Sequence, residues 1–201
     1  MEERTLVGVH PEVRPLLGQS VQRARLLDAI VDVVAAKGYD AATVADIVKV
    51  ARVSRGTFYE LFDSKRACFA AAYVLGSEVL EQRVDEAVQD AADWREELRL
   101  GIRAYLTAFV EEPRFALVFL TETRAIAQER DDVIRRFATR YGLSMKKSGR
   151  PKPPDDALFV LAAGVDELAH AAIRAGRDVT DLEDTLVGCA VRFAAEEEPW
   201  T

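Results

Sequence analysis

The sequence predicts an all-α protein with a small N-terminal domain of three helices and a larger helical domain after it. Apolar residues recur at helical spacing along most of the 201 residues, and no convincing strand pattern or internal repeat interrupts them. Residues 43–62 contain two short amphipathic segments separated by a tight turn, which is the pattern of a helix-turn-helix. The hydrophobic content of 49% is enough to fill the core of one large domain or two small ones.

The N-terminal domain is expected over residues 20–66. Residues 1–19 show no clear helical period, so we predict a flexible arm there. A first helix is expected over residues 20–37, because Leu26, Ile30 and Val33 share one face and Gly38 follows the last helical position.

The helix-turn-helix follows over residues 43–62. Thr43 and Asp46 have the spacing of a capping box, which predicts that a helix begins after Thr43. Ser54 is placed to cap a second helix whose buried stripe contains Phe58, Leu61 and Phe62. The first turn of that second helix, residues 55–57, is small or cationic and is expected to face outward, as in a helix that enters the major groove of DNA.

This segment resembles the DNA-reading unit of the TetR family of bacterial regulators. The family pattern runs Ala-Gly-Val-Ser-x-Gly-Thr-x-Tyr-x-x-Phe with a Lys three residues later, and residues 51–65 follow it without a gap. Two positions depart from the pattern. Arg52 replaces the usual Gly, which adds roughly 1 kcal/mol of strain if the backbone there is left-handed. Leu61 stands where the family often has His or another aromatic residue.

The second helix of the motif carries the candidates for reading bases. Arg55 can bridge O6 and N7 of a guanine, and a contact to phosphate is an equally good interpretation. Gly56 lets the helix approach DNA closely, and Thr57 can touch a thymine methyl group or a phosphate. Ser54 completes this group as the cap of the same helix.

Three further residues are candidates for contacts to the DNA backbone. The hydroxyl of Tyr59 can reach a phosphate, although its ring can instead pack beneath the helix. Thr43 and Lys65 begin helices, where backbone N–H groups favour a phosphate, and Thr43 can act as a cap as well. The resemblance implies that matching positions of the family make mostly such backbone contacts.

The second domain is expected over residues 67–201. Helices are predicted after residues 63–64 to about 89, over 93–110, from 113 onward, and over 131–144, 155–175 and 180–195. A basic loop, residues 146–154, contains Gly-Arg-Pro, which is the core of minor-groove hooks but is more often part of a solvated linker. The resemblance implies an effector pocket among these helices. Its candidate lining consists of aromatic residues and two polar groups: Trp94, Tyr105, Phe109, Phe115, Phe119, Glu122, Tyr141, Phe159 and His170.

The last two helices are predicted to form a dimer interface. Their most apolar faces carry Leu158, Leu161, Val165, Ala169, Leu182, Leu186, Cys189 and Phe193. In the family these two helices pair between subunits into a four-helix interface. The alternative is that these faces close the core of the monomer. A dimer is favoured because one short recognition helix reads too few bases to bind well alone.

Charge and composition limit the other classes of function. The net charge of −7 is uneven, because residues 1–66 sum to +1 and residues 67–201 sum to −8. The two Cys residues are far apart, and the two His residues offer no catalytic triad or metal pair, so we expect no enzyme activity, metal or cofactor. No secretory signal or membrane-spanning stretch is evident, which indicates a cytoplasmic protein with reduced thiols.

Together these features predict a DNA-binding transcriptional regulator, most simply a dimeric repressor on a palindromic operator. A small, mainly apolar effector is expected to release it from DNA by moving the helix that begins near Lys65, a mechanism that the resemblance implies. The alternative is a constitutive or partner-regulated DNA-binding protein without an effector.

Overall fold

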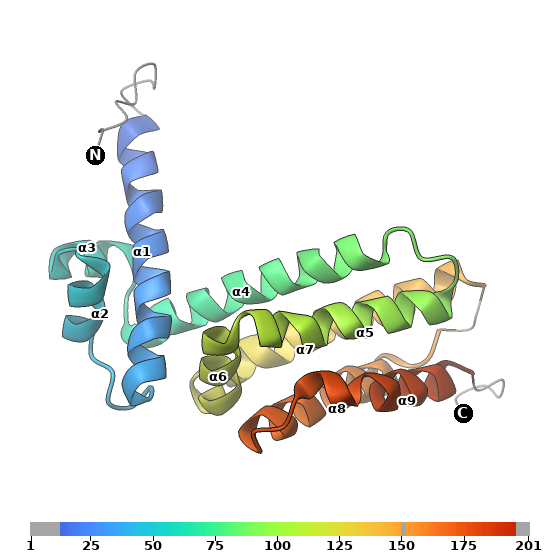
Figure 1. Cartoon of the computed structure of the whole chain (residues 1–201). Helices are drawn as coiled ribbons and strands as arrows, with labels where there is room; N and C mark the ends of the chain where they lie inside the picture. The colour runs from blue at the N-terminus through green and yellow to red at the C-terminus, as the bar shows by residue number, and fades with distance from the viewer. Residues whose placement is uncertain (1–12, 150–151, 196–201) are drawn as a thin grey trace. The chain divides into compact units, whose positions relative to one another are not determined.

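The computed structural model describes residues 13–149 and 152–195, and this part of the chain is helical without any strand, which confirms the predicted fold class (Figure 1). The chain forms two compact units that divide after Ala72, six residues beyond the predicted boundary. The first unit contains α1 (Val13–Lys37), α2 (Val44–Ala51), α3 (Arg55–Leu61) and the start of α4 (Lys65–Val88). The second contains the rest of α4, then α5 (Trp94–Glu111), α6 (Pro113–Thr121), η1 (Thr123–Ile126), α7 (Ala127–Lys147), α8 (Asp155–Arg174), η2 (Val179–Leu182) and α9 (Glu183–Ala195).

Helix α1 begins earlier than the sequence suggested. Residues 13–19 form its first two turns, so the prediction of a flexible arm is wrong for them, and residues 1–12 lie outside the described part. Pro15 is the third residue of α1. It is tolerated there because the first backbone N–H groups of a helix have no partner within the helix.

The first unit is held together by the apolar stripes that its sequence pattern predicts. Leu26 and Ile30 of α1, Ile47 of α2, Phe58 of α3 and Phe69 of α4 have no measurable exposure to solvent. Helix α1 packs against both α2 and α3, so these side chains meet in one core. This core fixes α2 and α3 as a helix-turn-helix.

The turn between α2 and α3 contains the one non-glycine residue with a left-handed backbone in the described part of the chain. Arg52 has φ 54° and ψ 46°, and its N–H donates to the carbonyl of Val48 at the end of α2. This conformation costs an L-residue roughly 1–2 kcal/mol, which agrees with the glycine that the family pattern has at this position.

Replacing Arg52 with Gly is therefore expected to stabilise the first unit by about 0.5–1 kcal/mol. Relief of the left-handed strain exceeds the extra chain entropy that glycine adds to the unfolded state. Arg52→Ala is the matched control, because it removes the cation but keeps the strained backbone. Urea denaturation of the three proteins measures the effect. Equal stability of Arg52→Gly and Arg52→Ala would contradict it.

The second unit is a bundle in which α7 packs along α8 and α5 packs along α9 (Figure 1). Asp93 caps α5 by accepting from the N–H groups of Arg95 and Glu96, and Pro113 opens α6, both as predicted. Helix α7 starts at Ala127 rather than near residue 131, directly after η1. The last predicted helix is divided, because residues 179–182 form the 3₁₀ turn η2 before α9. In the described part of the chain, no helix is long and apolar enough to cross a membrane.

Candidate functional site

The N-terminal end of α3 presents small polar groups at the surface of the first unit. Ser54 accepts from the N–H of Thr57 at 2.9 Å, and the two hydroxyl oxygens lie 2.9 Å apart. Arg55 and Gly56 are exposed, and a methyl group built on Gly56 would touch only Ser54, at 3.5 Å. The backbone of Gly56 is thus open to close approach by a ligand such as DNA.

Arg55 and Tyr59 form a pair on the exposed side of α3. The guanidinium carbon of Arg55 lies 5.7 Å from the centre of the Tyr59 ring. The Tyr59 side chain is 48% exposed, although the edge of its ring contacts Phe58. The exposed position favours the interpretation that Tyr59 offers its hydroxyl outward over the alternative that its ring is packed beneath the helix.

Thr43 forms the predicted capping box at the start of α2. Its hydroxyl accepts from the N–H of Asp46 and donates to the Asp46 carboxylate at 2.6 Å, while the Thr43 N–H donates to the same carboxylate. These hydrogen bonds, with Lys37 at 2.9 Å, lower the pKa of Asp46 to about 2. The Thr43 hydroxyl proton is therefore engaged within the protein.

The side chain of Lys65 is engaged within the protein, whereas a contact to phosphate requires a free ammonium group. Its ammonium group donates to the backbone carbonyls of Tyr39 and Ala42 at 2.7 and 2.9 Å. It also lies 4.1 Å from the centre of the Tyr39 ring. The side chain thus ties α4 to the segment between α1 and α2. Lys65 remains a candidate for DNA contact only through its backbone N–H at the start of α4.

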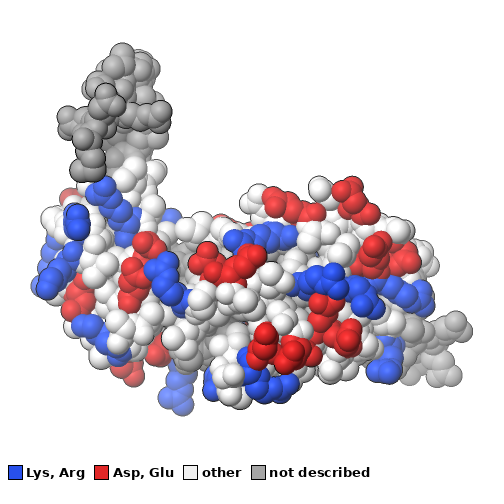
Figure 2. Space-filling view, viewed as in Figure 1, with Lys and Arg blue, Asp and Glu red and all other residues white. Residues whose placement is uncertain are grey.

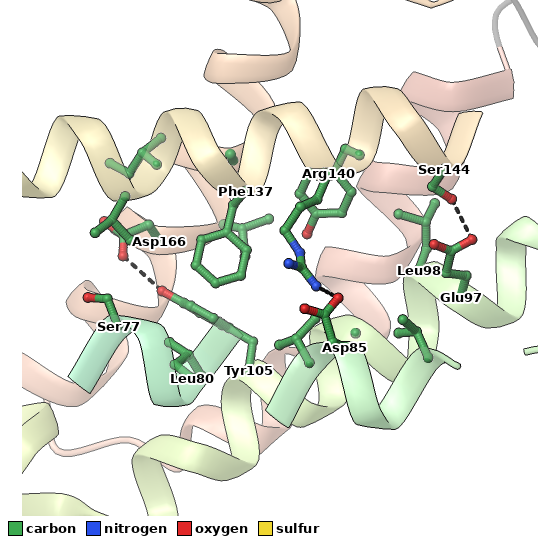
Figure 3. A pocket seen from close by; sticks show the side chains of 18 of the residues that line it. Ser77, Leu80, Asp85, Glu97, Leu98, Tyr105, Phe137, Arg140, Ser144 and Asp166 are labelled. Atoms are coloured by element: carbon green, nitrogen blue, oxygen red, sulfur yellow. Dashed lines mark hydrogen bonds and ion pairs between the residues drawn. The ribbon is translucent and has the colours of Figure 1, made fainter. Parts of the chain in front are cut away.

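A large cavity lies wholly within the second unit. Its volume is about 550 Å³, within the range of small-molecule sites. Helices α4, α5, α6, α7 and α8 all contribute to its wall, and Phe137 and Tyr105 project into it in Figure 3. Six of the nine predicted pocket residues line it: Tyr105, Phe109, Phe115, Phe119, Tyr141 and His170.

The other three predicted pocket residues do not line this cavity. Trp94 is the first residue of α5 and is buried in the bundle core, with the guanidinium of Arg95 over its ring. Phe159 packs beneath Arg135 of α7, 4.8 Å from its guanidinium carbon. Glu122 ends α6 at the junction with η1, away from the cavity. These three residues were predicted because they are aromatic or acidic residues in apolar helices. That character does not determine whether a side chain faces the cavity.

The sequence interpretation also missed wall residues on α4 and α7. Helix α4 contributes Tyr73, Ser77, Leu80, Val84, Asp85 and Val88, and Gln89 follows directly after it. Helix α7 contributes Phe137 and Arg140 among others. The signal on α4 was its apolar face at steps of three and four over residues 73–88. No pocket residue was predicted on that face, because a cavity leaves no mark in the periodicity.

A buried polar cluster sits in the wall of the cavity. Asp166 accepts from the hydroxyl of Tyr105 at 2.8 Å and from Arg130 at 2.5 Å, and Nε2 of His170 lies 3.1 Å from it. Burial opposes the charge on Asp166, but the hydrogen bond from His170 and the charge of Arg130 outweigh it and hold the pKa of the carboxyl below its usual range. Burial and the neighbouring Asp166 raise the pKa of the Tyr105 phenol. The cluster is internally neutralised.

The opposite end of the cavity is more polar and more exposed. Arg140 forms an ion pair with Asp85 across the space between α7 and α4, and Ser144 donates to Glu97 at 2.6 Å (Figure 3). Gln89, Leu143 and Lys147 line this end and are exposed, whereas the wall near Tyr73, Ser77 and Phe119 is buried. The cavity therefore opens toward the C-terminal end of α4.

The faces of α8 and α9 predicted to form a dimer interface point inward. Leu158, Leu161, Val165, Ala169, Leu182 and Leu186 are buried within the monomer, and Phe193 packs against the same core. In the monomer these seven side chains follow the alternative interpretation, in which the most apolar stripe of each helix closes its own bundle, and their place in a dimer interface stays a prediction. Cys189 alone of the set is exposed.

The outward face of these helices carries small and apolar groups beside the exposed charges of Glu167 on α8 and Arg192 on α9. Val160 of α8 is 68% exposed, and Gly164 and Ala171 follow on the same side. A side chain at Gly164 would meet nothing within 4 Å. On α9, Gly188 and Cys189 lie on the exposed or half-exposed side. We call Val160, Gly164, Ala171, Gly188 and Cys189 the outer face.

Other sites considered in the sequence find no further support. Cys68 is buried, and burial raises the pKa of its thiol to about 12, which leaves almost no reactive thiolate. No group of three potential metal-ligating side chains occurs within residues 13–149 and 152–195. In the basic loop, residues 146 and 147 end α7, Lys152 pairs with Asp155, and residues 150–151 lie outside the described part. Figure 2 shows charges of both signs interspersed over the second unit on the face drawn.

Comparison with known proteins identifies the first unit. Residues 26–72 match the model of the family described as bacterial regulatory proteins, tetR family. Over 100 residues the chain is 28% identical to a fatty acid metabolism regulator protein of Bacillus subtilis, which covers 50% of this chain and 52% of that protein. It is 45% identical over 47 residues to YvdT, an uncharacterised HTH-type transcriptional regulator of the same organism, or 23% of this chain and 24% of the relative. The chain thus matches about half of one curated relative and a quarter of the other.

Solved structures share the fold of the whole chain. A FadR from Bacillus subtilis in complex with stearoyl-CoA has a TM-score of 0.73 at 20% identity, over 84% of this chain and 97% of that one. A fatty acid degradation regulator FadR from Bacillus halodurans has a TM-score of 0.72 at 18% identity, over 89% and 97%. The helix-turn-helix geometry, the family match and this shared fold agree. Residues 26–72 therefore form a DNA-binding domain of the tetR family of bacterial regulatory proteins, and the whole chain shares its fold with the FadR regulators.

Proposed function

We propose that this protein is a ligand-responsive repressor that binds a palindromic operator as a dimer and leaves it when a long, mainly apolar effector fills the pocket of the second unit. The observation that carries this proposal is the cavity of about 550 Å³ enclosed by five helices. A constitutive DNA-binding protein would have no need of such a space.

The shape of the cavity supports an elongated effector. Its lining residues on α4 extend from Tyr73 to Val88, which corresponds to about 22 Å at 1.5 Å per residue of helix. Aliphatic and aromatic side chains line most of this length, and the open end carries the cations Arg140 and Lys147 together with Asp85, which pairs with Arg140, and Glu97. A fatty acyl chain with an anionic head group fits this arrangement. The relative of similar fold that was solved with stearoyl-CoA makes long-chain acyl-CoA the first compound to test.

A dimer places two copies of α3 on one operator. The outer face of α8 and α9 is the surface that supports this assembly, since small residues there allow helices of two subunits to approach closely. Symmetric pairing explains how a seven-residue recognition helix can bind specifically.

Arg55→Ala is expected to relax sequence preference at one operator position by about 1–3 kcal/mol, because a bidentate contact to guanine is lost. Arg55→Lys is the matched control, since it keeps the charge but cannot make the bidentate contact. Titration against single-base operator variants measures the preference. If Arg55→Ala weakens every variant equally while Arg55→Lys retains full affinity, Arg55 contacts phosphate instead.

Footprinting on DNA that flanks the gene for this protein, followed by titration of the protected fragment with and without stearoyl-CoA, tests the proposed function. We expect protection over a palindrome and loss of protection when the compound is added. A compound that raises thermal stability but leaves operator affinity unchanged does not qualify as an effector. Operator binding that resists every apolar ligand that the pocket binds would favour the constitutive alternative.

A further inference from the structure

Aromatic rings close the buried end of the cavity. Tyr73 of α4 and Phe119 of α6 lie with their ring centres 5.3 Å apart, and the ring of Phe115 is 4.3 Å from that of Phe119. All three side chains line the cavity, and Tyr73 and Phe119 are buried. They lie opposite the end marked by Gln89 and Lys147, where the wall is exposed to solvent.

Phe115 is seated directly on the backbone of α4. A Cβ atom built on Gly76 would overlap the tip of the Phe115 ring, so the ring occupies the space that any other residue would fill. Gly76 is in the middle of a helix, where glycine costs about 0.5–1 kcal/mol relative to alanine. The close approach of the ring explains why glycine is needed at this position.

The polar groups near this end do not disturb its apolar character. Ser77 donates to the carbonyl of Tyr73 at 2.8 Å, one turn back on α4. The carboxylate of Asp166 accepts from both Tyr105 and Arg130. Arg130 balances the charge of Asp166, so the closed end can accept hydrocarbon without an unpaired carboxylate beside it, although Nδ1 of His170 and Nε of Arg130 are buried without a hydrogen-bond partner.

We propose that Phe115, held in place by Gly76, is the end wall of the pocket and sets the length of apolar chain that the protein accepts. This inference rests on the proposed function and names the residue pair that determines specificity within its pocket. In the wild type, each methylene that the channel buries is expected to improve affinity about fourfold until the chain meets Phe115. Longer chains then gain nothing or bind more weakly.

Substitutions of Phe115 and of Gly76 are expected to change the longest chain that the pocket accepts in opposite directions. Phe115→Ala removes the ring, so the gain in affinity should continue to longer chains. Gly76→Ala forces the ring away from α4 into the channel, so the gain should stop at shorter chains. In the double variant the new methyl group has room, and the chain-length limit should return to that of Phe115→Ala alone. Phe115→Trp shortens the channel without altering α4 and replaces Gly76→Ala if that variant does not fold.

The experiment is calorimetric titration of these variants with saturated acyl-CoA thioesters from octanoyl to eicosanoyl and with the matching free fatty acids. Leu117→Ala is the control, because it removes apolar volume from the exposed side of α6. It should keep the wild-type limit. An identical limit in all variants would overturn the inference. The inference would also be overturned if the wild type bound no chain in either series. The proposed function is tested separately, and it fails if no ligand of any class alters operator binding.

Discussion

Ala169→Glu is expected to unfold the second unit rather than to split a dimer, at a cost on the order of 3–5 kcal/mol. Ala169 has no exposure to solvent and belongs to the core shared by α5, α8 and α9. A carboxylate there would be buried among the apolar side chains of this core. The circular dichroism melt of the variant should shift strongly to lower temperature.

Gly164→Glu is the matched variant on the outer face of the same helix. A side chain at this position meets nothing within 4 Å in the monomer, so the fold should keep its stability. If the outer face pairs between subunits, the two introduced charges repel and weaken the dimer. Sedimentation should then show a shift toward monomer together with weaker operator binding. A stable Ala169→Glu monomer, or an unaffected Gly164→Glu dimer, would refute this assignment of inner and outer faces.

Lys65→Met is expected to destabilise the first unit by about 2–3 kcal/mol, since hydrogen bonds to charged groups are among the stronger ones in proteins. Methionine keeps much of the apolar stem but leaves the carbonyls of Tyr39 and Ala42 without the ammonium donor. Urea denaturation measures the loss. Lys49→Met, on the exposed side of α2, is the control for removal of a cation and should change stability by less than about 0.5 kcal/mol.

The salt dependence of operator binding separates the two possible roles of Lys65. With its ammonium group engaged inside the unit, the slope of log affinity against log salt should be the same for wild type and Lys65→Met when both are folded. A slope smaller by about one unit, with unchanged stability, would show that the side chain neutralises a phosphate and would overturn the structural role.

Local chemistry made the first unit predictable. The capping box at Thr43, the cap at Ser54 and the left-handed Arg52 depend on residues within a few positions of one another, and the structure confirms all three. The hydrogen bonds of the Lys65 side chain could not be predicted in this way, because its partners lie more than twenty residues earlier in the chain. Helical periodicity predicted the buried stripes correctly. It could not predict whether a helix of the same chain or a partner subunit covers them.

The same limit explains the errors in the second unit. The stripe through Leu161 and Ala169 was assigned to a partner subunit, although it is buried in the apolar core of the same chain, where α7 packs along α8. Six aromatic and polar residues of the pocket were found because large side chains cluster around a cavity, whereas Trp94 and Phe159 have the same character and pack elsewhere. Which rings enclose empty space depends on helix packing, and the spacing along one helix does not contain that information.

The central claim is that one ligand-filled pocket controls DNA binding, and thermodynamic reciprocity tests it most directly. The affinity of stearoyl-CoA is measured once for the free protein and once for the protein saturated with operator DNA. If the pocket and the DNA surface are coupled, operator DNA must weaken ligand binding by the same factor by which the ligand weakens operator binding, typically 5–150-fold. Equal ligand affinity in the two titrations would contradict the account, because a ligand that binds both states equally cannot release the protein from DNA.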